Sequence, residues 1–170
     1  MKNSKKVAVC AVLAALSVVL LFVGSASQIL DLSCAAFASI IIMYIFIEIG
    51  GAWPYLTYAA VSLLSLLILP DKFAAVVYLL FAGYYPMIKL TIEKHTRTAV
   101  GFIFKIIIFN LALTGVILIS KFILLLPDDE IGLKWIVYAS ANAAFILFDV
   151  ALTRLISLYL YRLRKRFKIK

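Results

Sequence analysis

Polar and charged residues inside otherwise apolar stretches are the candidates for chemistry in this sequence. They are Glu48, Lys105, Asn110, Asn142, Asp149 and Arg154. Such groups are expensive to keep in hydrocarbon, so each marks a ligand contact, a coupling group or a structural ion pair. Glu48, Lys105 and Arg154 lie at similar depths from the basic ends of their segments, and we expect them to form intramembrane ion pairs.

Asn142 and Asp149 are seven residues apart, nearly two helical turns, so they share one face of a helix. Their side chains would either contact a ligand or form hydrogen bonds between helices. We expect a substrate site in the outer halves of the later helices, with two classes of contact. Its predicted polar contacts are Asn110, Asn142 and Asp149, and its predicted stacking surfaces are Tyr78, Trp135 and Tyr138.

Motifs for catalysis, cofactor binding and metal binding are missing from the sequence. His95 is the single histidine, and the two cysteines, Cys10 and Cys34, are predicted near opposite membrane faces, too far apart for a disulfide. One histidine and scattered carboxylates make no metal-ligand cluster. A glycine-rich phosphate loop and a nucleophile motif are also absent. We therefore expect no enzymatic activity, no cofactor and no metal.

The elements that position these residues are long apolar runs. Of 170 residues, 66% are hydrophobic and only 15% are charged, too little polar surface for a water-soluble globule. The runs cover residues 7–23, 32–49, 53–69, 73–92, 99–126 and 133–161. Their lengths suit membrane-spanning helices, and they lack the strict alternation of barrel strands. The sequence predicts an all-α membrane bundle of six helices in one domain, residues 1–170.

The loop charges predict the orientation of the bundle. Lysine and arginine gather at the N-terminus, around residues 89–97 and in the tail 162–170, whereas Asp31, Asp71 and residues 128–130 mark the other side. Because cytoplasmic loops are enriched in basic residues, both termini are predicted cytoplasmic, in the plasma membrane, after an even number of crossings. The net charge of +9 is explained mainly by this asymmetry. We expect the tail to bind an anionic leaflet rather than nucleic acid.

Turn and interface residues complete the pattern. Gly50 and Gly51 predict a turn between the second and third runs. Aromatic residues including Tyr84 and Tyr85 are predicted near the membrane interfaces, where amphipathic rings are enriched.

Small residues form a second motif, on the first apolar run. Ala11 and Ala15 have the AxxxA spacing that allows another helix to approach closely, either within the bundle or from a partner protein.

A basic N-terminus leading into the alanine-rich segment Lys6–Leu16, six runs and a long last helix with a basic tail together resemble the substrate-binding S component of energy-coupling factor transporters. The resemblance implies capture of a vitamin-like small molecule from the outer face. It also implies contact of Ala11 and Ala15 with a transmembrane coupling subunit that works with a cytoplasmic ATPase pair. The alternative is a structural protein without transport activity, resembling a small membrane protein of bacterial shape-determining complexes.

Overall fold

The computed structural model describes residues 3–27, 29–95, 98–122 and 135–163. Every element in these ranges is helical, so the predicted all-α class is confirmed. Five helices are long and apolar enough to cross a membrane. Their bounds are Asn3–Ser27 (α1), Asp31–Glu48 (α2), Lys72–His95, Val100–Lys121 within α6 (Thr98–Phe122), and Trp135–Tyr161, which begins with α7 (Trp135–Leu158).

The sixth helix, α3 (Trp53–Ile68), occupies the third predicted run but has only 16 residues. At 1.5 Å per residue it is about 24 Å long, whereas the hydrocarbon core is about 30 Å thick. The even number of crossings and the cytoplasmic termini therefore stay predictions. Several predicted features lie outside the described residues, namely the acidic loop 128–130, the run ends at 126 and 133, and the tail from 164 onward.

The fourth predicted run is not a uniform α-helix. It consists of α4 (Lys72–Val77), the π-helix η1 (Tyr78–Ala82) and α5 (Tyr85–His95). The amide of Gly83 donates to Tyr78 O, five residues back, at 2.8 Å. Pro86 follows in the first turn of α5, where the missing amide is tolerated. The chain therefore changes its hydrogen-bond register between α4 and α5.

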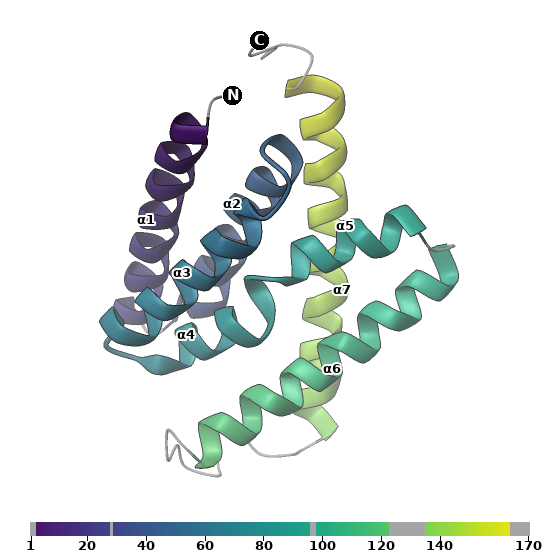
Figure 1. The fold of residues 1–170 in the computed structure, drawn as a ribbon. Coiled ribbons are helices and arrows are strands. Elements are labelled where there is room, and N and C mark those ends of the chain that lie inside the picture. Colours follow the sequence, from purple (N-terminus) through teal and green to yellow (C-terminus); the bar gives the residue numbers. More distant parts are fainter. Residues whose placement is uncertain (1–2, 28, 96–97, 123–134, 164–170) are drawn as a thin grey trace. The chain divides into compact units, whose positions relative to one another are not determined.

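The chain forms two compact units, Met1–Leu133 and Lys134–Lys170, and each is described by itself. The predicted single domain stays a prediction. In the first unit, α1 packs against α2 and α3 (Figure 1). The contact face of α1 is rich in small residues. Gly24 lets the backbones of α1 and α2 lie close together, since a Cβ there would lie 2.8 Å from Cys34 Cβ. The second unit consists of α7 and the π-helix η2 (Tyr159–Leu163) among its described residues.

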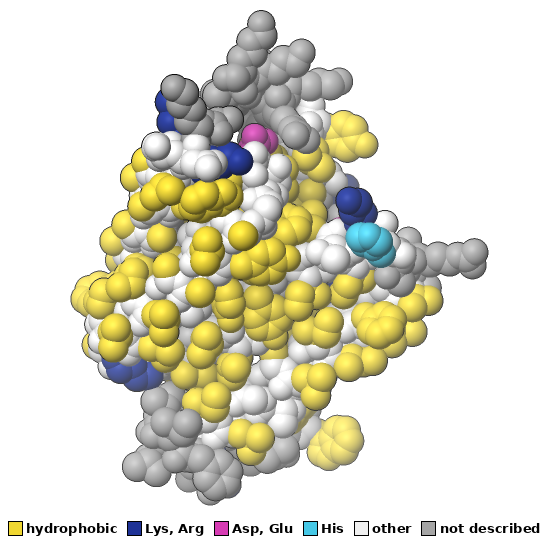
Figure 2. All heavy atoms as spheres, in the orientation of Figure 1, with side chains coloured by type: hydrophobic (Ala, Val, Ile, Leu, Met, Phe, Trp, Pro, Cys, Tyr) yellow, Lys and Arg dark blue, Asp and Glu magenta, His cyan; other side chains and the backbone are white. Residues whose placement is uncertain are grey.

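Much of the surface is as apolar as the interior. Figure 2 shows hydrophobic side chains over most of the visible face, with charged side chains toward its margins. Exposed residues include Val12, Leu63, Leu67 and Leu111, each more than half exposed. A water-soluble protein of this size rarely exposes so continuous an apolar surface, whereas lipid tails solvate it well. The surface is compatible with a multi-pass membrane protein.

Gly50 and Gly51 form the predicted turn between α2 and α3, and both have left-handed backbone conformations, with φ of 63° and 65°. This conformation is unfavourable for residues that carry a Cβ. We expect Gly50→Ala to lower the free energy of unfolding by about 1–2 kcal/mol, measured by thermal unfolding in detergent. The matched control is Gly115→Ala in the interior of α6, which should be neutral or slightly stabilising. Equal effects of the two substitutions would contradict the role of backbone strain.

Candidate functional site

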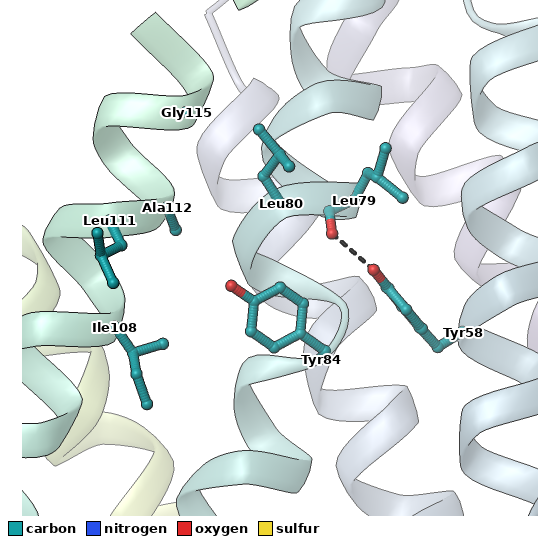
Figure 3. Close-up of a pocket in the computed structure, with 8 residues that line it drawn as sticks. All are labelled: Tyr58, Leu79, Leu80, Tyr84, Ile108, Leu111, Ala112 and Gly115. Carbon is teal, nitrogen blue, oxygen red and sulfur yellow. Dashed lines mark hydrogen bonds between the residues drawn. The ribbon is translucent and has the colours of Figure 1, made fainter. Parts of the chain in front are cut away.

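The first unit contains an open cavity of about 600 Å³ between α3, η1 and α6 (Figure 3). Its walls are almost entirely aliphatic and aromatic. The lining residues are Tyr58, Leu79, Leu80, Tyr84, Ile108, Leu111, Ala112 and Gly115. Small-molecule sites typically have this size, with an apolar wall and few polar groups.

The π-helix shapes one wall of this cavity through an unusual hydrogen bond. Because the Gly83 amide donates to Tyr78 O, it does not serve the Leu79 carbonyl four residues before it. The hydroxyl of Tyr58 donates to Leu79 O at 2.6 Å instead (Figure 3). A carbonyl released by a π-type turn would be costly to leave unpaired in an apolar region. The bond therefore fixes the Tyr58 ring against the turn.

Tyr84 supplies the polar group that a ligand can reach. Its ring meets that of Tyr58 edge to face, with centroids 6.1 Å apart, and its hydroxyl points into the cavity (Figure 3). Gly83 makes the arrangement possible, because a Cβ there would lie 2.5 Å from Tyr58 Cδ2. Tyr58 and Tyr84 also line a second cavity of about 370 Å³ that continues along α5 to Ile92. The two cavities thus share the rings of Tyr58 and Tyr84 as lining.

A charged cluster joins α5 to α6. Lys89 and Lys105 both contact the same oxygen of Glu93, Oε1, at 2.8 Å and 2.6 Å. The Lys89 side chain is completely buried, that of Lys105 is 7% exposed, and that of Glu93 is 37% exposed. Burial of two ammonium groups in an apolar protein requires such compensation, so the carboxylate holds the two helices together at this point.

The predicted substrate contacts of the first unit, Tyr78 and Asn110, do not lie together. Tyr78 is completely buried behind the cavity lining, with its ring 6.2 Å from that of Tyr58. Asn110 lies on a different side of α6 from the cavity residues Ala112 and Gly115, and its amide donates to Ile106 O at 2.9 Å. Neither residue lines the cavity.

The remaining predicted ligand contacts lie on α7 in the second unit. Their spacing of three, four and seven residues places them on one face of that helix. They are Trp135, Tyr138, Asn142 and Asp149. The Asn142 amide donates to Tyr138 O at 2.8 Å, within the helix. Their role in binding stays a prediction.

The predicted ion pairs have a partner that the prediction did not include. Lys105 contacts Glu93, which lies in the stretch 89–97 whose basic residues mark the predicted cytoplasmic side. Glu48 is exposed near the end of α2, and Arg154 is exposed on α7 in the second unit. Pairing among Glu48, Lys105 and Arg154 stays a prediction.

The interface position of Tyr84 and Tyr85 stays a prediction. Both residues lie at the middle of the apolar segment Lys72–His95, and Tyr85 is completely buried. Gly83 next to two tyrosines and Pro86 was the sequence signal for a special backbone at this point. Tyr58 carried no such signal, because its importance depends on the neighbouring helix.

The two cysteines are free. Ala11 and Ala15 lie on the exposed side of α1, whereas Ala14 belongs to its buried face. Internal packing within the described residues therefore does not explain the AxxxA spacing.

The cavity offers apolar walls, two aromatic rings and the Tyr84 hydroxyl as contacts for a ligand. Among the described residues, no group of three or more histidine, cysteine, aspartate or glutamate side chains is arranged to hold a metal ion. Comparison with known proteins yields no match, neither to a family model nor to a curated protein nor to a solved structure.

The charged cluster allows a quantitative test by a double-mutant cycle of Glu93→Gln and Lys105→Met. We expect Glu93→Gln to lower the free energy of unfolding by about 1–3 kcal/mol, below the full value for a buried pair because Glu93 is partly exposed. The two substitutions should couple by about 1 kcal/mol or more, measured by unfolding in detergent. Additive effects would show that the contact contributes nothing to stability.

Proposed function

We propose that this protein is the substrate-binding membrane subunit of an energy-coupled uptake transporter, and that it takes up a small, mainly apolar molecule with a ring. The cavity lined by Tyr58 and Tyr84 carries this proposal. Its volume of about 600 Å³ suits a vitamin-sized molecule. Two aromatic rings held at a steep angle offer stacking and edge contacts, and the Tyr84 hydroxyl offers one directional hydrogen bond.

The exposed small residues of α1 support the part of the proposal that concerns a partner for energy coupling. A capture subunit without its own ATPase needs a surface for a coupling subunit. Ala11 and Ala15 are exposed on a helix whose opposite face is already packed. Small side chains allow a partner helix to approach closely, which is the main source of helix association in lipid.

Substitutions at Gly115 test the cavity. A Cβ at this position would lie 3.5 Å from Leu80 Cδ1, an ordinary contact, so the methyl group of Gly115→Ala fits. Gly115→Leu places three further carbons in the cavity. Native mass spectrometry of the detergent-purified protein should show a bound small molecule in the wild type and in Gly115→Ala. We expect Gly115→Leu to lower the affinity about tenfold or more, a loss of about 1.4 kcal/mol.

Equal retention of the bound mass by Gly115→Leu and Gly115→Ala would place the ligand elsewhere. Recovery of phospholipid masses alone would overturn the capture proposal, since the cavity would then hold only the surrounding lipid.

The α1 surface is tested by co-purification from native membranes. Ala11→Leu combined with Ala15→Leu should abolish recovery of a polytopic coupling subunit and its ATPase pair while leaving the bound small molecule in place, because the added side chains prevent close helix approach. The matched control is Ala60→Leu, at an exposed alanine of α3. A partner set without an ATPase, together with no retained small molecule, would favour the structural protein instead.

A further inference from the structure

The first unit contains two carboxylates that form no ion pair among the described residues. Asp31 begins α2 and is only 7% exposed, while Asp71 precedes α4. The Oδ1 atom of Asp31 is buried and has no hydrogen-bond partner within the described residues. A buried carboxylate oxygen without a partner is strongly unfavourable unless a proton or a cation compensates it.

The last turn of α1 contacts the backbones of both acidic residues. Adding a Cβ to Gly24 would place it 3.4 Å from Asp31 Cα. The adjacent Ser25 is bonded to Asp71, since its hydroxyl accepts from Asp71 N at 2.9 Å and donates to Asp71 O at 3.1 Å. Adjacent residues of one helix turn, Gly24 and Ser25, thus contact the two acidic residues.

The nearest basic residue in sequence does not neutralise this pair. The Lys72 ammonium donates to Leu69 O at 2.6 Å. The ion pairs that the structure gives in the described ranges involve Glu93, not Asp31 or Asp71. One oxygen of Asp71, Oδ1, accepts from Phe73 N at 3.0 Å, which leaves the other oxygen for a ligand.

We propose that Asp31 and Asp71 form a binding site for a divalent cation of the Ca²⁺ class. A proton would neutralise only one of the two acids, whereas a divalent cation balances both charges. The Ser25 hydroxyl is a neighbouring oxygen, and the carbonyls of a last helical turn lack partners further along their helix. Ca²⁺ prefers carboxylate, hydroxyl and carbonyl oxygens, and it accepts the irregular arrangement that a helix end offers. Because two carboxylates balance the charge of one divalent cation, the site needs no third acidic residue. Bound cation would tie α1, α2 and α4 together.

Thermal unfolding of the purified full chain tests the site, with CaCl2 compared against EDTA at constant ionic strength. We expect Ca²⁺ at about 100 times its dissociation constant to raise the Tm of the wild type by roughly 5–10 °C. Asp31→Asn should abolish this shift while remaining at least as stable as the wild type in EDTA, because it removes a buried charge. Asp71→Asn keeps a side chain suited to the N-cap of α4, so its loss of the shift would report on the cation rather than on the helix.

The matched control is Glu48→Gln, which removes a carboxylate at the other end of α2 and should keep the full shift. Equilibrium dialysis with ⁴⁵Ca²⁺ should give one site per chain for the wild type and for the control, and none for Asp31→Asn. An absent Ca²⁺ shift in the wild type, or an equal shift in Asp31→Asn, would overturn the proposal. Stabilisation by acid but not by Ca²⁺ would also overturn it and assign a shared proton to the pair.

Discussion

The structure depends on one constraint, which is that a polar group surrounded by hydrocarbon is costly to leave without a hydrogen-bond partner. The helices satisfy their backbones internally. Polar side chains follow the same rule locally, since Ser17, Thr57, Thr91 and Thr114 each donate to the carbonyl four residues earlier. Such bonds use the hydroxyl without requiring a neighbouring helix. These four hydroxyls are therefore satisfied without forming a site.

The cavity lies where a carbonyl is not satisfied within its own helix. At Tyr78–Ala82 the helix changes register, and the released Leu79 carbonyl is satisfied by Tyr58 of another helix. This bond between helices fixes a ring that would otherwise rotate, and the small Gly83 lets that ring approach the backbone. A rigid aromatic wall loses little conformational freedom when a ligand binds. The hydrogen bond that satisfies the Leu79 carbonyl thus also holds the Tyr58 ring in place in the cavity wall.

Charged groups show two outcomes of the same constraint. Lys89 and Lys105 are buried but share the Glu93 carboxylate, so their charges stabilise the contact of α5 with α6. Asp31 and Asp71 have no ion pair among the described residues, and Asp31 Oδ1 is buried without a hydrogen-bond partner there. The presence or absence of an oppositely charged side chain separates the structural cluster from the candidate ligand site.

The sequence by itself determined the all-helical class, the approximate bounds of the apolar helices and the turn at Gly50–Gly51, because hydropathy, helix length and glycine conformation are properties of consecutive residues. Only the tertiary structure decided that Tyr58 meets a carbonyl 21 residues away and that Lys105 contacts Glu93. It also separated Ala11 from the buried face of α1. These outcomes depend on how each helix is rotated and which neighbour it meets, and no local pattern along the chain encodes that rotation.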